Sequence, residues 1–269
     1  MTLVENGSST GCGKTGISAP RVIGYRNKRV KDFFVGGLPL RCTIALAISS
    51  AAIMRVESFV SYTDVVIDLS HYNCNVNLAN AAADGVAAVI HKATQGASDA
   101  DPLYQENLAQ AKAANLLWGA YHFGTGEDGV AQAEFFLDTV QPTADTLLVL
   151  DFEANPQGAS ISIEDGRAFL VHVYNATGRW PGIYGGYYLK QLLGSVTDPT
   201  FQNCWLWLAQ YGPTAVVPPN WSSWTLWQYT DGAAGFQPCK VAGIGLCDRN
   251  FYRDTPEQLR SKWSQGSLT

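Results

Sequence analysis

Eight short runs of apolar residues recur between residues 63 and 252. Short apolar runs that are bounded by polar, Gly or Pro residues are typical of strands buried on both faces of a sheet. The predicted strands are residues 63–70, 85–94, 116–124, 146–153, 181–186, 204–211, 223–230 and 245–252.

Between and after these runs, polar and apolar residues are spaced as in helices. The predicted helices are residues 77–84, 102–115, 130–140, 163–177, 187–193 and 256–263. A helix therefore follows each of the first five strands, whereas loops without a helical pattern join the last three.

Regular alternation of strand and helix predicts a parallel sheet with its helices on the outside. Eight strands indicate an α/β fold closed into a (β/α) barrel of the TIM type. A regular barrel of this type takes about 250 residues, so this one has fewer helices. An open doubly wound sheet is the alternative.

Residues 1–62 form an N-terminal extension that differs from the barrel domain at 63–265. They contain eight Lys or Arg and three Asp or Glu, whereas the remainder contains 10 basic and 20 acidic residues. An acidic body is a poor match for nucleic-acid phosphates, so no nucleic-acid partner is expected. Residues 11–15, Gly-Cys-Gly-Lys-Thr, lack the first Gly of a phosphate-binding loop and are interpreted as a chance match.

Within the extension, residues 43–54 contain no charged residue. These 12 residues are fewer than the roughly 20 that span a membrane, so no stable span is expected. The segment fits the apolar core of a signal peptide with a long basic N-region. An uncleaved anchor or a buried helix is a second interpretation. A true translation start at Met54 is the third.

Acidic residues stand repeatedly at strand ends. Asp68 ends the first strand, Asp151 and Glu153 end the fourth, and Asp248 lies on the last. Strand ends of a parallel barrel meet on one face, where active sites form. Mutual repulsion and burial raise the pKa of clustered carboxyl groups, and glycoside hydrolysis needs a carboxylic acid that stays protonated near neutral pH. A helix cap or a surface charge is the alternative for any one of them.

Other chemistries have weaker support. The four histidines, His71, His91, His122 and His172, lack paired metal-ligand spacing, and each is expected to be a hydrogen-bonded core or rim residue. No nucleophile-elbow Ser or supported catalytic Cys is present. No metal and no cofactor is therefore expected.

Six motifs occur in an order and spacing that resemble the glycoside hydrolase family 25 lysozymes, the Chalaropsis-type N-acetylmuramidases. The resemblance runs from about residue 64 to residue 263 and does not cover the extension. Its motifs are VIDLSHYN at 66–73, HKATQG at 91–96, YHFG at 121–124, LDFE at 150–153, WQY at 227–229 and CDRN at 247–250.

The resemblance implies a flattened TIM-like barrel with eight strands and fewer helices. It implies cleavage of the β-1,4 bond between N-acetylmuramic acid and N-acetylglucosamine in peptidoglycan. Glu153 matches the general acid/base, Asp151 the assisting carboxylate, and Asp68 and Asp248 the remaining two acids. All four positions are filled, which argues against an inactive relative.

Four side chains at or near strand ends are candidates for contact with sugar, because aromatic rings stack on apolar sugar faces and amides bond acetamido groups. An alternative for each is a structural role inside the barrel. The candidates are Tyr121, Tyr184, Trp207 and Gln228. The family often has Glu where this chain has Gln95, a difference that bears on substrate preference.

The barrel domain contains four cysteines. Cys239 and Cys247 bracket a short Gly-rich loop and predict a disulfide, which would fit an oxidising compartment. Cys74 and Cys204 are expected on opposite faces and are predicted to stay unpaired. The doublet spacing of a zinc site is absent.

Two rival functions differ from a muramidase. One is hydrolysis of another N-acetylated glycan such as chitin, but the longer acidic pattern of family 18 chitinases is absent, since Val149 stands before Asp151. The other is non-catalytic binding of peptidoglycan. We expect a monomer whose partner is the peptidoglycan polysaccharide, either secreted or acting as a cytoplasmic phage lysin released at lysis.

Overall fold

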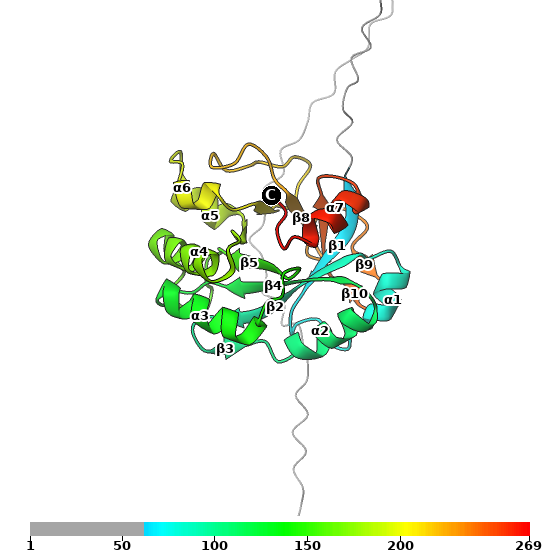
Figure 1. Ribbon diagram of the computed structural model, residues 1–269. Helices are drawn as coiled ribbons and strands as arrows, with labels where there is room; N and C mark the ends of the chain where they lie inside the picture. Colours follow the sequence, from blue (N-terminus) through cyan, green and yellow to red (C-terminus); the bar gives the residue numbers. More distant parts are fainter. Residues whose placement is uncertain (1–61) are drawn as a thin grey trace, which may run out of the picture. The chain divides into compact units, whose positions relative to one another are not determined.

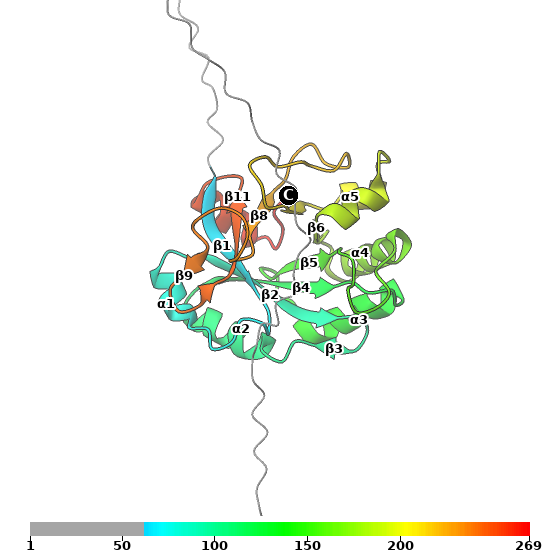
Figure 2. The ribbon, with the colours of Figure 1, turned by 180° about the vertical axis from the view of Figure 1, so that it is seen from behind.

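The computed structural model describes residues 62–269. The strands form a sheet in the order β1-β11-β8-β7-β6-β5-β4-β2-β3, and β1 also pairs with β2, so the sheet closes. This confirms an eight-stranded barrel and excludes the open doubly wound sheet (Figures 1 and 2). The barrel strands are β1 (Thr63–Leu69), β2 (Ala88–Gln95), β4 (Leu117–Phe123), β5 (Leu147–Asp151), β6 (Gly182–Gly185), β7 (Leu206–Ala209), β8 (Leu226–Thr230) and β11 (Asp248–Tyr252); β3 (Asp99–Ala100) extends the sheet beside β2.

One strand departs from the predicted parallel sheet. The pairs from β1 through β2, β4, β5, β6 and β7 to β8 are parallel, but β11 runs antiparallel to both β8 and β1. No helix follows β8; the chain returns through the small hairpin of β9 (Lys240–Val241) and β10 (Gly245–Leu246). An antiparallel return needs no crossover helix. Asp248, the first residue of β11, therefore lies beside Asp68 near the end of β1.

The helices lie outside the barrel and match the predicted segments closely. Figure 1 shows α2, α3 and α4 along the outer side of β2, β4 and β5. Side-chain caps fix the residue at which several helices begin. The side chains of Asp128, Ser162 and Thr255 each accept a hydrogen bond from a backbone N–H of the first helical turn. The helices are α1 (Leu78–Ala83), α2 (Tyr104–Ala113), α3 (Gly129–Val140), α4 (Ile163–Thr177), α5 (Tyr187–Leu193), the unpredicted α6 (Pro199–Gln202) and α7 (Pro256–Trp263).

Alternation along the strands divides the core into two clusters. Along β5, Leu148 and Leu150 belong to the cluster between barrel and helices, whereas Leu147 and Val149 belong to the cluster inside the barrel. Successive side chains of a strand point to opposite faces, so one uninterrupted apolar run supplies both clusters. This explains why β5 is buried at every position.

Helix α7 contributes a side chain to the inner cluster. Trp263 is fully buried there, and its indole Nε1 donates to the carbonyl of Trp118, 3.0 Å away. Gly119 leaves room for this ring, because a Cβ at that position would lie 3.4 Å from Trp263 Cζ2 and 3.2 Å from Leu147 Cβ. Residue 263 lies beside the early residues of β4, away from the strand ends that carry the acidic residues.

The cysteine predictions need two corrections. Cys239 and Cys247 are free buried thiols, so the predicted disulfide between them is wrong. They face each other across the β9–β10 hairpin, but the Cys239 Sγ contacts Gln237 Oε1 at 3.2 Å, and burial raises the pKa of Cys247 to about 12. Cys74, predicted to be unpaired, is disulfide-bonded; it lies partly buried in the turn after β1. Cys204 is free, as predicted, and is buried.

The predictions for the extension lie outside residues 62–269. These are the signal-like segment at 43–54, the start at Met54 and the chance match at 11–15. Among the described helices, none combines the length and apolar character that crossing a membrane requires.

We predict that Trp263→Ala lowers the free energy of unfolding by about 3–5 kcal/mol, the usual cost of truncating a buried aromatic residue. The substitution leaves a cavity in the inner cluster beside Gly119 and removes the hydrogen bond to the carbonyl of Trp118. Urea denaturation followed by circular dichroism measures the change. Gln258→Ala, at an exposed position of the same helix, is the control and should change stability by less than about 0.5 kcal/mol. Equal effects of the two substitutions would contradict this role.

Candidate active site

The fourth barrel strand directs two carboxyl groups into the barrel mouth. Leu147 and Val149 point inside, so the next residue of the same series is Asp151. The backbone N–H of Phe152 donates to the carbonyl of Tyr184 at 2.8 Å, which extends the pairing with β6 beyond β5, and the Phe152 ring is buried in the outer cluster. Glu153 therefore follows Asp151 on the inner side.

The same rule places the other rim residues. On β1, Val66 is in the inner cluster and Asp68 comes next; on β8, Leu226 is followed by Gln228. β11 runs in the opposite direction, so its inner series starts at the rim with Asp248 and descends through Asn250 to Tyr252. Period-two alternation in a closed barrel thus brings together residues that are far apart in sequence.

A cavity of about 210 Å³ lies at this mouth. Every candidate catalytic and sugar-contacting residue named from the sequence is part of its lining, together with three that sequence reasoning missed. The lining consists of Asp68, Tyr121, Asp151, Glu153, Tyr184, Trp207, Gln228 and Asp248, with Ser70, Tyr72 and Tyr211 in addition.

Hydrogen bonds hold Asp68 in a fixed orientation. Gln228 Nε2 lies 3.1 and 3.2 Å from its two carboxylate oxygens, and Asn250 Nδ2 donates to Oδ2 at 2.8 Å. Gln228 is itself oriented, because its Oε1 accepts from the hydroxyls of Tyr184 at 2.7 Å and Tyr211 at 2.8 Å. The indole of Trp207 likewise donates to Asn250 Oδ1 at 2.6 Å. Asp68 is thus the acceptor at the centre of a network of fixed donors.

Burial nevertheless makes the ionised form of Asp68 costly. Removal from water raises its pKa from 3.8 to about 6, and the hydrogen bonds from Asn250 and Gln228 lower the value only in part. Desolvation is the larger effect because the carboxyl group is almost inaccessible to solvent. The site therefore contains an acid that changes protonation in the mildly acidic range.

Asp151 and Glu153 are also shifted upward. Burial raises the pKa of Asp151 well above its usual range, and the charge of Glu153 adds to this, whereas Lys92 opposes it. Burial and then Asp68 raise the pKa of Glu153. Asp151 Oδ1 is buried and accepts no hydrogen bond from the described residues. Both carboxyl groups of the pair therefore favour the protonated form more than an exposed carboxyl group does.

Aromatic rings form one side of the cavity. The rings of Tyr184 and Trp207 meet edge to face at 4.7 Å, and those of Tyr121 and Trp207 at 6.4 Å. Trp207 is fully buried and Tyr184 nearly so, while Tyr121 is partly exposed. Such packed rings keep a rigid surface beside the carboxyl groups.

The described histidines do not enter this cavity. The Nδ1 atom of His91 lies 2.7 Å from the carbonyl oxygen of Lys92, and its Nε2 atom lies 3.0 Å from Asn107 Nδ2. Burial lowers the pKa of His91. His122 contacts Thr94 and Gln132, and burial lowers its pKa to about 4. Within residues 62–269 no group of three or more His, Cys, Asp or Glu is arranged to hold a metal ion.

Three of the functional positions carried little or no sequence signal. Asn250 is two residues from Asp248 and so on the same strand face, a signal that could have been used. Tyr211 closes a predicted strand, and nothing in the strand pattern marks it as a residue of the site. Tyr72 lies in the turn after β1, where no periodicity indicates a direction.

Comparison with known proteins identifies the family to which the chain is similar. Residues 67–234 match the family model described as Glycosyl hydrolases family 25. Lysozyme M1 of Streptomyces globisporus is 28% identical over 218 residues, covering 72% of this chain and 69% of that protein. The N,O-diacetylmuramidase of Chalaropsis sp is 30% identical over 187 residues, covering 62% of this chain and 88% of that protein.

Solved structures are similar in fold. The lysozyme of Streptomyces coelicolor superposes with a TM-score of 0.67 at 28% identity, covering 75% of this chain and 97% of that one. A family GH25 lysozyme from Aspergillus fumigatus gives a TM-score of 0.65 at 30% identity, covering 77% and 100%.

The pKa of Asp68 can be measured. We expect its carboxyl carbon to titrate near pH 6 in ¹³C NMR, with the signal assigned by its loss in Asp68→Asn. Gln228→Leu removes a donor to the ionised form and should move the titration to higher pH. Because the folded-state value is raised, the contribution of Asp68 to stability is largest below about pH 4 and falls as the pH rises to about 6. Titration below pH 5 in the parent would contradict the dominance of burial.

Proposed function

The chain belongs to the glycosyl hydrolases of family 25, and on that premise we propose that it cleaves the β-1,4 bond between N-acetylmuramic acid and N-acetylglucosamine in peptidoglycan. It is a glycoside hydrolase of the lysozyme type. The observation that carries the proposal is the cavity in which Asp68, Asp151, Glu153 and Asp248 meet beside aromatic rings.

Glu153 is the general acid of the proposed reaction. It is less buried than Asp151 and lines the cavity, so a glycosidic oxygen can reach it. Burial and then Asp68 raise its pKa, which favours the protonated form that a general acid needs. Glu153 donates that proton to the leaving oxygen as the bond from this oxygen to the anomeric carbon breaks. The resulting carboxylate then accepts a proton from the water that completes hydrolysis.

Asp151 assists at the anomeric centre. Asp151 lines the cavity, so its carboxyl group can accept the N–H of a 2-acetamido group. In that position it orients the acetamido group and, when ionised, stabilises positive charge that develops at the anomeric carbon. Substrate-assisted routes of this kind are recognised among glycosidases.

Asp68 and Asp248 support this pair, and aromatic rings line the cavity that receives sugar. The charge of Asp68 adds to the effect of burial in raising the pKa of Glu153, and the hydrogen bonds of Asp68 fix its own position. Asp248 lies opposite Asp68 across the β1–β11 pair. Tyr121 is the more exposed ring and offers surface to the glycan, while the buried Tyr184, Trp207 and Gln228 shape the cavity around it.

The place of action follows from the substrate. We propose that the protein is a monomer that meets peptidoglycan outside the cytoplasmic membrane, by secretion or as a phage lysin released at lysis. Relatives include the Autolytic lysozyme of Clostridium acetobutylicum, 30% identical over 160 residues. Fractionation of culture medium and cells separates the two routes.

Identification of the new chain end tests the reaction. The full chain is incubated with purified peptidoglycan, and the products are reduced and analysed by mass spectrometry. Reduced N-acetylmuramic acid at the chain ends supports the proposal. Reduced N-acetylglucosamine would overturn the assigned bond. Retained binding without release of fragments would favour the non-catalytic alternative, and turnover of chitin alone would favour another N-acetylated glycan.

We predict that Glu153→Gln lowers kcat by about 10²–10⁴-fold, the usual contribution of a general acid, while the unfolding transition is unchanged. The amide fills the same volume but cannot deliver the proton. Glu134→Gln, at an exposed position of α3, is the matched control and should retain activity. Undiminished turnover by Glu153→Gln would remove Glu153 from the mechanism.

The pH profile should respond to Asp68. Its negative charge raises the pKa of Glu153, so Asp68→Asn should lower that pKa. Turnover requires protonated Glu153, and the alkaline limb of kcat/KM should therefore move to lower pH. Asp138→Asn, at an exposed position of α3, should leave the limb in place. A limb that moves to higher pH in Asp68→Asn would contradict this coupling.

A further inference from the structure

A second cavity continues from the proposed active site. It encloses about 260 Å³ and shares part of its lining with the first, including Tyr121 and Asp151. Its far side is built from Lys92 and Gln95 on β2 and from Asn155 and Gln157 after β5. A glycan strand that enters the first cavity can therefore extend into the second.

Charge is distributed unevenly along this path. Four carboxyl groups line the first cavity, and a third cavity, which shares Gln95 and Asn155 with the second, has Asp99 and Glu127 in its lining. Among the described residues that line these three cavities, Lys92 is the single cation. An anionic group of a bound glycan would meet carboxyl groups on either side of this position and an ammonium group only here.

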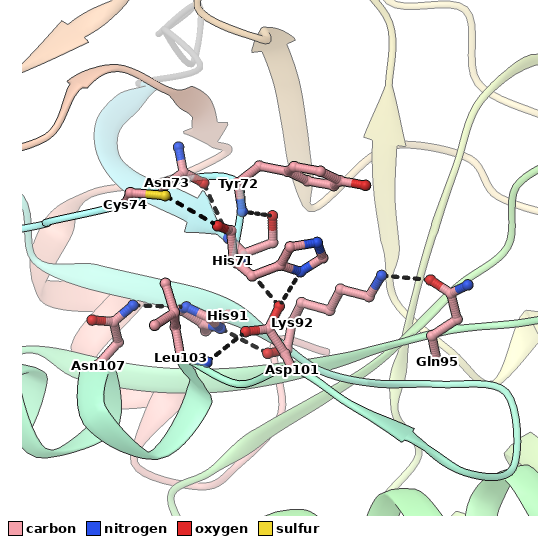
Figure 3. A network of polar contacts seen from close by, with 11 residues as sticks. His71, Tyr72, Asn73, Cys74, His91, Lys92, Gln95, Asp101, Leu103 and Asn107 are labelled. Carbon is pink, nitrogen blue, oxygen red and sulfur yellow. Dashed lines mark hydrogen bonds and ion pairs between the residues drawn. The ribbon is translucent and has the colours of Figure 1, made fainter. Parts of the chain in front are cut away.

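The fold holds Lys92 in place. Ala88 and Ile90 belong to the inner cluster, so Lys92 is the next inner residue of β2. Its Nζ donates to Gln95 Oε1 at 2.6 Å (Figure 3) and lies 5.2 Å from the centroid of the Phe123 ring. The side chain thus has a fixed direction across the floor of the second cavity.

Within the described residues, 62–269, the Lys92 ammonium lacks a partner of opposite charge at contact distance. The ion pairs within residues 62–269 involve His71, Arg167 and Arg249, and none involves Lys92. Gln95 accepts one hydrogen bond without neutralising the charge, and an ammonium group has two further donors. Burial lowers the pKa of Lys92, and the more distant carboxylates of Asp151, Asp101 and Asp99 oppose that shift.

We propose that Lys92, with the amides of Gln95, Asn155 and Gln157, forms a subsite for a carboxylate of the peptidoglycan strand. This inference rests on the proposed function. N-acetylglucosamine has no carboxyl group, whereas muramic acid has a lactyl carboxyl group, free in peptide-free strands and joined to peptide elsewhere. The peptide has carboxylates of its own. The shared ligand chemistry is a carboxylate, and the subsite would recognise the muramic acid side of the substrate.

Binding is measured in full-length Glu153→Gln protein, which is expected not to consume the ligand. Isothermal titration calorimetry compares two pairs of ligands. The first pair is a peptide-free muramyl tetrasaccharide with lactyl carboxylates and the same glycan with lactyl carboxamides. The second pair is a peptide-bearing glycan with its peptide carboxylates free and the same glycan with them amidated. We expect amidation of the recognised carboxylate to weaken binding about tenfold, the value of one charge-assisted hydrogen bond. The pair of ligands that shows the loss identifies the source of the carboxylate.

Substitutions then link the preference to the subsite. Lys92→Met should abolish the difference between carboxylate and carboxamide, Lys92→Arg should retain most of it, and Gln95→Glu should reduce it by placing a carboxylate beside Nζ. Lys190→Met is the matched control, because Lys190 also donates to a glutamine, Gln210 Oε1 at 2.8 Å, but lies outside the three cavity linings. It should keep the full difference.

Two outcomes overturn the subsite: equal affinity for carboxylate and carboxamide in both ligand pairs, or an unchanged preference in Lys92→Met. Neither depends on turnover. Failure of the Glu153-intact chain to release muramic acid ends would overturn the proposed function alone, while a Lys92-dependent preference for carboxylate would still support the subsite.

Discussion

The site depends on the alternation of side chains along strands of a closed barrel. Residues that point inward near the bottom of the barrel form an apolar cluster, and the next inward residues of the same strands face the mouth. On β5 the inner series changes from Leu147 and Val149 to Asp151, and on β1 it changes from Val66 to Asp68. Carboxyl groups from distant parts of the chain therefore converge because the apolar residues below them are fixed by packing.

This arrangement also explains the electrostatics of the mouth. The apolar cluster beneath keeps water from the base of the cavity, so burial is the largest cause of the raised pKa of Asp68, Asp151 and Glu153. Of these three carboxyl groups, Asp68 is the one that accepts several hydrogen bonds from described residues, from Gln228 and Asn250. Similar residue types thus acquire different proton affinities from their depth and their neighbours, which is what acid–base chemistry with several carboxyl groups requires.

Much of the fold and the positions of the proposed catalytic residues could be predicted from the sequence. The strands are nearly continuous apolar runs and several helices have side-chain caps, so local patterns were sufficient. The antiparallel direction of β11 was not visible, because direction depends on the connection after β8 and not on the strand itself. The state of Cys74, Cys239 and Cys247 was predicted wrongly, since pairing depends on three-dimensional neighbours that spacing does not reveal. Tyr72 lies in a turn and had no pattern to indicate where it points.

Lys92 shows that the position of each charge along the cavities matters more for ligand binding than the net charge of the domain. The residues after the extension carry an excess of acidic groups, which would suggest that an anionic polymer is repelled. Within the cavities, however, the acids gather around the proposed scissile bond and at the far end of the path, and the ammonium of Lys92 lies between them. An anionic substituent can therefore be accepted at one register of the glycan and disfavoured at others. A repeating polymer in which carboxyl groups occur on alternate sugars would then be positioned by its charge as well as by its shape.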